Sequence, residues 1–282
     1  QVGRFNQLFL TGTFRNDSRM AEAFGIQPLR GEKSRNASAG VTSKISNRIH
    51  LTLDAYWIQI RNRIIFTGPI QRNNSTPRVG KILDSLNHRD INAVRFFTNA
   101  ISTRTQGIDA VVTGNWPIHK SVLEILVSAN FTRTRVYGSV QSAKNLPDSV
   151  QYRDVLFNVE ERGRIEQGQP RNKIILSAIY KTGKWEFATR AVRFGKVASI
   201  YNGSDRSFDE VLSPKVNSGF RIAYAPKPWI TVTAGAMNIF NVYPDRLKNY
   251  INSMEGILLY SDKAIQFGNN GIFYFMNMEF NL

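Results

Sequence analysis

Apolar and polar residues alternate along this chain in about ten stretches, each roughly ten residues long. The alternation is clear in the stretches that begin near Ser121 and Val216, and again at the end of the chain. In that last stretch every second residue is apolar: Tyr274, Met276, Met278, Phe280 and Leu282. Because successive side chains of a β-strand point to opposite faces, the pattern predicts strands with one apolar and one polar face.

The links between these stretches alternate in length. Tight turns are predicted at 46–47, 117–119, 182–184 and 226–228. Long polar loops are predicted at roughly 66–100, 134–171, 195–214 and 241–270. Short turns at one end and long loops at the other are typical of a transmembrane β-barrel, and a spanning sheet must close because lipid cannot satisfy unpaired backbone groups. We therefore predict an all-β fold, an antiparallel transmembrane β-barrel with about ten strands in this chain.

Aromatic residues gather beside the short turns. They are Trp116, Trp185 and Trp229, with Tyr180 and Tyr224 close by. Indole and phenol rings prefer the headgroup zone of a membrane, so these residues predict an aromatic girdle at one rim of the barrel. A soluble β-sandwich would also alternate along its strands, but it does not predict this placement.

Composition narrows the possible chemistry. The chain has no cysteine, which excludes disulfides, thiol catalysis and Cys-based zinc sites. Its three histidines, His50, His88 and His119, do not cluster at metal-ligand spacing, so we expect no metal site and no cofactor. Only His88 lies in a long loop, beside Asp90. Because a histidine beside an aspartate can activate a water molecule, an alternative function is that of a surface protease built on a self-contained ten-stranded outer-membrane barrel. The same self-contained barrel could also serve as a structural scaffold.

The chain is strongly basic, with 37 Lys and Arg against 21 Asp and Glu and a net charge of +16. Such a charge attracts anionic partners, but the basic residues are spread through the loops rather than clustered on one helix. This spread favours the interpretation that the chain is one part of a larger protein, whose other part carries the balancing acidic residues. We expect no nucleic-acid partner. Residues 1–5 lack the pattern of a secretory signal, so we expect a signal that was removed or a chain that is part of its precursor.

Several motifs resemble, in family order, the C-terminal half of TonB-dependent outer-membrane receptors. They are Thr-Gly-Thr-Phe-Arg at 11–15, the run at 20–25, Gly-Glu-Lys-Ser at 31–34, the strand at 54–64, Asn-Ala at 99–100, Gly-Ile-Asp at 107–109, and Asn-Ile-Phe-Asn at 238–241 followed by Tyr-Pro at 243–244. The final strand also resembles the C-terminal signal that the outer-membrane insertion machinery reads.

The resemblance implies a 22-stranded barrel of the bacterial outer membrane with a plug domain inside it. The plug and about twelve earlier strands would lie outside this chain, and the first strand, near residues 5–13, would pair with that other barrel half. The implied partners are this N-terminal part, the TonB complex acting through the plug, lipopolysaccharide and membrane lipids, the insertion machinery and a small nutrient ligand. The implied function is uptake of a scarce nutrient; an iron chelate (siderophore), cobalamin, a glycan and a peptide all remain open.

The long loops carry the candidate ligand-binding residues, because a rigid scaffold can position variable loops. These residues mix aromatic rings, which can stack on a ligand, with cations that can pair with its charge. They are Arg95, Phe96, Phe97, Arg153, Tyr201, Arg206, Phe208, Tyr250 and Tyr260. By strand parity, Asp109, Glu124, Glu186 and Arg190 are predicted to face the barrel lumen, where they would contact the plug or water.

Overall fold

The computed structural model describes residues 10–72, 77–138, 156–250, 252–253 and 257–280. It divides the chain into two compact units. The first unit comprises residues 1–35, 58–104 and 135–162, and the second comprises 36–57, 105–134 and 163–282.

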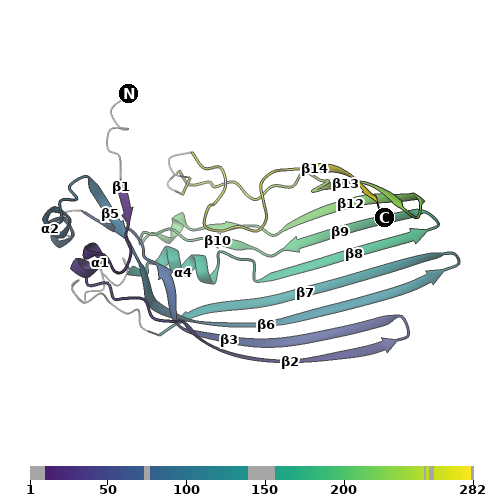
Figure 1. Ribbon diagram of the computed structural model, residues 1–282, viewed down its shortest axis with the longest axis horizontal. Helices are drawn as coiled ribbons and strands as arrows, with labels where there is room; N and C mark the ends of the chain where they lie inside the picture. Colours follow the sequence, from purple (N-terminus) through teal and green to yellow (C-terminus); the bar gives the residue numbers. More distant parts are fainter. Residues whose placement is uncertain (1–9, 73–76, 139–155, 251, 254–256, 281–282) are drawn as a thin grey trace. The chain divides into compact units, whose positions relative to one another are not determined.

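The dominant element is a nine-stranded sheet with the strand order β14-β13-β12-β9-β8-β7-β6-β3-β2 (Figure 1). Its strands are β2 Lys33–Ser46, β3 Ile49–Phe66, β6 Phe97–Ile118, β7 Ser121–Tyr137, β8 Asn172–Thr182, β9 Trp185–Phe194, β12 Lys215–Lys227, β13 Ile230–Met237 and β14 Phe273–Phe280. All pairings from β7 to β14 are antiparallel. Neighbours in the sheet follow the order of the long strands along the chain, as in an up-and-down barrel wall.

The predicted alternation of short and long links is confirmed. Two residues separate β2 from β3, β6 from β7, β8 from β9 and β12 from β13. The turn predicted at 117–119 lies slightly later, because β6 continues to Ile118 and His119 adopts the left-handed conformation (φ 54°). Gly183 (φ 55°) has the same role between β8 and β9, since two-residue hairpin turns need positive φ angles.

The strand register separates the side chains into two faces. One cross-strand row, which we assign to the apolar face, runs over six strands: Leu123, Tyr180, Phe187, Ile222, Ala234 and Met276. An adjacent row on the opposite, polar face is Val122, Lys181, Glu186, Ala223, Thr233 and Asn277. The apolar and polar residues of each strand therefore align with those of its neighbours, as the sequence predicts.

The apolar face is not covered by another layer of the described chain. Tyr274, Met276 and Phe280 of β14 are 71%, 67% and 58% exposed. Two stacked soluble sheets would bury these side chains, so the sandwich alternative is wrong. An apolar surface of this extent needs lipid to cover it.

The buried core of the first unit lies outside the nine-stranded sheet. It packs α1 Arg19–Phe24 and α2 Pro77–Ser85 against a small sheet of order β1-β5-β4, with β1 Leu10–Thr13, β4 Ile70–Gln71 and β5 Ile91–Arg95. The core residues are Met20, Ala21, Phe24, Ile26, Ile70, Val79, Leu83, Val94, Phe96 and Leu156. The hydroxyl of Ser18 caps α1 by accepting the N–H of Ala21 at 3.2 Å, and Gly25 ends the helix at φ 70°.

One strand was assigned wrongly from the sequence. The strand predicted near 5–13 was expected to be a barrel strand; residues 5–9 lie outside the described part, and β1 pairs in parallel with β5 instead of joining the large sheet. β1 leads into α1, whose Met20, Ala21 and Phe24 lie in the core of the first unit together with Val94 of β5. The remaining elements are α4 Val159–Glu166, β10 Val197–Ser199, the 3-10 turn η1 Arg206–Phe208 and β11 Glu210–Leu212. No helix among the described residues combines the length and the apolar character needed to span a membrane.

Hydrogen bonds from one side chain to the backbone end β13 where the Asn-Ile-Phe-Asn motif begins. Asn238 is buried at φ 54°, and its amide group exchanges two hydrogen bonds with the backbone of Val242, both 2.8 Å long. Asn241, at φ 51°, accepts the N–H of Ile272 at 3.1 Å. The motif thus fixes the exit from β13 and the approach to β14.

We predict that Asn238→Ala destabilises the full receptor more than Asn238→Gly. Alanine loses both hydrogen bonds and must hold a left-handed conformation, which together cost about 2–4 kcal/mol. Glycine loses the hydrogen bonds alone, at about 1–3 kcal/mol, because it adopts positive φ without strain. The check is the temperature at which the purified, detergent-solubilised receptor loses its heat-modifiable band. Equal midpoints for the two variants would contradict the backbone part of this account.

The ends of the sheet generate a second prediction. β2 and β14 are edge strands, and unpaired strand edges are not tolerated in lipid. Expressed alone, the 282-residue polypeptide is therefore expected not to form a heat-modifiable, protease-resistant barrel. Co-expression with a polypeptide that supplies the other barrel strands should restore both properties. A closed barrel formed by these residues alone would refute this.

Candidate functional site

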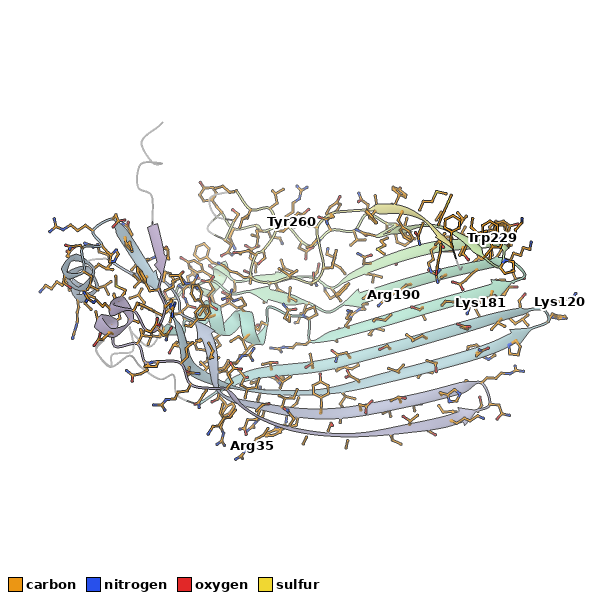
Figure 2. All side chains as sticks on the ribbon, in the orientation of Figure 1. Arg35, Lys120, Lys181, Arg190, Trp229 and Tyr260 are labelled. Atoms are coloured by element: carbon orange, nitrogen blue, oxygen red, sulfur yellow. The ribbon has the colours of Figure 1, made fainter. Side chains whose placement is uncertain are left out.

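Four charged side chains cross the polar face close to the tight turns. Lys181 Nζ lies 2.8 Å from Glu124 Oε1, and Arg221 Nη2 lies 2.5 Å from Glu186 Oε1. Lys181 and Glu186 also face each other in the register of β8 and β9. Opposite charges therefore alternate over four neighbouring strands, and this part of the wall is electrically balanced. Figure 2 shows Lys181 near the turn end of the sheet, where Lys120 and Trp229 also lie.

Further along the same face the charge becomes positive around a hollow of about 530 Å³. Its lining includes three cations and two aromatic rings from neighbouring strands: Lys173, Arg190, Arg221, Phe194 and Phe275. Lys173 Nζ lies 5.3 Å from the Phe194 ring centroid, and Asn217 adds an amide. Cations beside aromatic rings can bind an anionic, unsaturated group through charge and stacking together.

Three of the predicted loop residues meet in one compact loop between β10 and β11. The rings of Tyr201 and Phe208 are 5.2 Å apart. Arg206 donates to the carbonyl oxygens of Tyr201 and Gly203, and its Nη1 lies 3.4 Å from Asp209 Oδ1. The Arg206 cation is thus used to hold the loop, while both aromatic rings stay partly exposed.

A buried carboxylate joins this loop to the loop that follows β13. Glu210, at 6% exposure, accepts the backbone N–H groups of Lys248 and Asn249 at 2.7 and 3.1 Å and the Asn252 amide at 2.8 Å. The same loop is tied back by Gln266, which donates to the carbonyl oxygens of Gly195 and Ser213. Three donors to one carboxylate compensate its burial.

A second carboxylate, Asp245, anchors the same loop to the start of β12. It pairs with Lys215 Nζ at 2.6 Å and accepts both the N–H and the hydroxyl of Ser213 at 2.5 Å. Burial alone would raise the pKa of Asp245, but the ion pair and these hydrogen bonds outweigh burial and lower the pKa to about 2.

The anchored loop presents the remaining aromatic candidates. Tyr250 follows the Glu210-bound Asn249 and is 64% exposed. Tyr260 stacks on Tyr243 with ring centroids 6.4 Å apart, and Figure 2 shows it toward the end of the second unit away from Trp229. The second unit thus brings Tyr201, Arg206 and Phe208 onto one loop, and Tyr250 and Tyr260 onto a loop bonded to it.

The other predicted ligand residues belong to the first unit. Arg95 donates to the Thr67 carbonyl at 2.7 Å, lies 4.0 Å from the Phe66 ring centroid and 3.5 Å from Glu161. Phe97 is 46% exposed, but Phe96 is completely buried in the core, so its assignment as a surface ligand contact is wrong. Arg153 lies outside the described residues.

The residues predicted to form a girdle share the apolar face. Register places Tyr180, Trp185 and Tyr224 in adjoining rows, with the Trp185 and Tyr224 rings 4.4 Å apart. Trp116 lies against Gly114 near the end of β6, and Trp229 stacks on Phe280 with centroids 6.4 Å apart. In the terminal strand, Tyr274, Met276, Met278 and Phe280 share this face, while Leu282 lies outside the described residues.

The residues behind the alternative functions can also be placed. No group of His, Cys, Asp and Glu side chains in the described ranges could hold a metal ion. The ring of His88, on which the protease alternative depended, packs edge-on against Phe14 at 5.6 Å. Sequence reasoning missed Glu210, Asp245 and Gln266, because single polar residues in long loops have no periodic signature.

Comparison with known proteins agrees with this architecture. Residues 2–239 match the family model described as "TonB dependent receptor-like, beta-barrel". No curated protein sequence matches the chain.

Solved structures share the fold at low sequence identity. The outer membrane transporter YddB of Escherichia coli is 11% identical with a TM-score of 0.57, over 89% of this chain and 33% of its own. The FrpB iron transporter of Neisseria meningitidis is 15% identical with a TM-score of 0.56, over 90% of this chain and 32% of its own. The ferric enterobactin receptor PfeA of Pseudomonas aeruginosa is 15% identical with a TM-score of 0.55, over 89% and 31%.

The chain thus spans about a third of the length of these structures. The sheet, its two faces and the family match agree on a partial barrel wall in the bacterial outer membrane. The chain belongs to the family of TonB-dependent receptor-like β-barrels.

Proposed function

We propose that this chain forms part of the wall and of the surface loops of a receptor that imports a scarce anionic nutrient. The nutrient binds first at the loops and then passes along the polar face through the barrel. Energy comes from the TonB complex pulling on a plug domain that lies outside this chain. The observation that carries the proposal is the positively charged hollow on the polar face.

The hollow supports a ligand with negative charge. Lys173, Arg190 and Arg221 line it, and only Arg221 has an ion pair, with Glu186, among the described residues. An unpaired guanidinium in a concave, partly apolar wall favours carboxylate, catecholate or phosphate groups. Two proteins with the same fold are described as an iron transporter (FrpB) and a ferric enterobactin receptor (PfeA). We therefore infer that the nutrient is an anionic iron chelate.

The loops support capture before transport. Tyr201, Phe208, Tyr250 and Tyr260 offer partly or largely exposed rings on loops that internal carboxylates hold in place. A binding surface that is already ordered loses less entropy when a ligand binds, and this favours affinity at low nutrient concentration. Arg95, Phe97 and Arg153 remain candidates in the first unit.

The membrane contacts follow from the apolar face. We propose that Trp116, Trp185, Trp229, Tyr180 and Tyr224 form an aromatic girdle at the periplasmic rim, because rings of this kind prefer the headgroup zone. The alternating row Tyr274, Met276, Met278, Phe280 and Leu282 is proposed as the signal for the insertion machinery.

We predict that Arg190→Gln in the full receptor weakens uptake of an anionic iron chelate. Loss of a charge-assisted contact of about 1.5–3 kcal/mol lowers affinity roughly tenfold to a hundredfold. The measurement is uptake of iron-55 supplied as a catecholate chelate to iron-limited cells that carry the variant as their sole copy. Uptake should also vanish without TonB.

Lys120→Gln is the matched control, because this exposed lysine sits in the tight turn after β6, away from the hollow. It should transport like the wild type. Normal uptake by Arg190→Gln would contradict the role of the hollow. Uptake of the catecholate that persists without the receptor gene would contradict the proposed function itself.

A pH dependence follows from the Asp245 anchor. The pKa of Asp245 in the folded protein, about 2, is below its ordinary value of 3.8, so the anchor stabilises the loop above pH about 4 and is lost as pH falls through about 2. The contribution is of the order of 2 kcal/mol. We therefore expect pepsin to cleave the loop at 241–270 much faster at pH 2 than at pH 4.

The variant Asp245→Asn should be cleaved readily at both pH values, because it has no charge to lose. Asp262→Asn, an exposed carboxylate in the same loop, is the control and should keep the wild-type pH response. A wild-type response in Asp245→Asn would show that another group controls the loop.

A further inference from the structure

The polar face changes character along β13 and β14. Toward the tight turns, its residues on the described parts of these two strands are Thr231, Thr233, Asn277 and Glu279. Toward the long loop that joins the strands, they are Gly235, Met237, Phe273 and Phe275. The half of this wall nearest the tight turns is therefore polar, and the half nearest the loop is apolar.

Three apolar side chains in the loop half, Met237, Phe273 and Phe275, form a continuous surface that we call the lumen strip. Met237 and Phe273 are register partners, and the rings of Phe273 and Phe275 are nearly parallel, with centroids 6.5 Å apart. Met237 and Phe273 are 58% and 59% exposed, so the described chain leaves most of their surface uncovered. The inner wall of a barrel of this kind is ordinarily polar, and a contiguous apolar surface on it indicates that a partner covers it.

The lumen strip is continuous with the positively charged hollow. Phe275 and Met237 line the hollow together with Arg190 and Arg221. Gly235 makes room for this arrangement, because a Cβ atom there would lie 2.7 Å from Cζ of Phe275 and 2.9 Å from Cβ of Arg221. The Phe275 ring and the Arg221 side chain thus border the same glycine, one from each of the strands that flank β13.

This arrangement fits a ligand with two chemically different parts. The cations of the hollow, Lys173, Arg190 and Arg221, attract negative charge, whereas the side chains of the lumen strip offer only carbon and sulfur atoms. A ligand that carries charge alone would leave the strip in contact with water. An apolar group attached to the charged part would cover the strip, and the transfer of both apolar surfaces out of water is favourable.

We propose that the nutrient is amphipathic: its anionic head binds the cations of the hollow, and a short apolar arm lies on the lumen strip. This inference rests on the proposed function, because it narrows the anionic iron chelate to one that carries such an arm. The strip lies on the loop side of the wall, so the arm lies toward the cell surface. Met237 and Phe273 are then specificity-determining residues, which select for the arm and leave the binding of the charge to the hollow.

The test compares two ferric catecholate chelates of equal charge that differ in one substituent, an acetyl or a hexanoyl group. Their dissociation constants are measured with iron-55 on the full receptor in mild detergent, at one detergent concentration, so that partition into micelles is the same for all variants. Each methylene that leaves water contributes about fourfold to affinity, so four additional, half-covered methylenes should tighten binding roughly tenfold to thirtyfold. The variant Met237→Gln/Phe273→Gln should bind the acetyl chelate like the wild type and lose most of this preference.

Thr233→Gln/Asn277→Gln is the matched control, because these two residues are also register partners on the same strands and the same face, nearer the tight turns. It should keep the wild-type preference for the hexanoyl chelate. Met237→Leu/Phe273→Leu should keep it as well, since the strip stays apolar. Arg190→Gln should weaken the binding of both chelates by the same factor.

The inference alone is overturned if the wild type binds both chelates equally, or if the folded Met237→Gln/Phe273→Gln variant keeps the preference. It is also overturned if this variant yields no heat-modifiable receptor, or loses heat stability and weakens both chelates equally, because the strip then packs against the plug domain. If neither chelate binds to the wild type, the proposed function itself is contradicted and the inference falls with it.

Discussion

Pairing of every backbone N–H and C=O group is the constraint on which this structure depends. A strand in lipid cannot bond to water, so it must bond to neighbouring strands along its length. Long strands joined by two-residue turns meet this demand in the described sheet, and they fix the register between neighbours. A slip of one residue would exchange the faces of a whole strand and would place Glu124 or Arg221 in lipid. Face, charge and position in the membrane are therefore consequences of the same hydrogen bonds.

Different forces order the parts of the chain outside the sheet. The first unit buries Phe24, Leu83 and Phe96 in a small hydrophobic core. The loops of the second unit instead depend on the carboxylates Glu210 and Asp245, which accept several backbone and side-chain donors each. Polar anchors of this kind hold a loop in place without burying the aromatic rings that a ligand would contact. The second unit thus combines ordered loops with exposed rings.

Much of the sheet could be predicted from the sequence, because alternation and turn chemistry act over neighbouring residues. The two faces of β7 and β14 and the positions of the long loops followed from this pattern. The place of β1 did not, because a short apolar strand has the same local pattern whichever sheet it joins. Phe96 was misassigned for a related reason: its burial depends on α1 and α2, which are distant in sequence. Glu210 was missed because its donors lie about 40 residues further along the chain.

The strand register also shows on which face of the sheet the basic residues of the chain lie. On the polar face of strands β7 to β14, cations and anions face each other across strands, as at Lys181 and Glu186, and positive charge is in excess around the hollow near Arg190. On the apolar face of strands β7 to β14, the described cations lie at strand ends: Arg133, Arg135 and Arg193 beside the long loops, and Lys227 beside a tight turn. Charge that is spread evenly for solubility would not separate in this way between two faces of one sheet. The separation follows if the polar face meets an anionic ligand inside the barrel, and if the cations of the apolar face lie at the levels of the lipid headgroups, where a charge costs least.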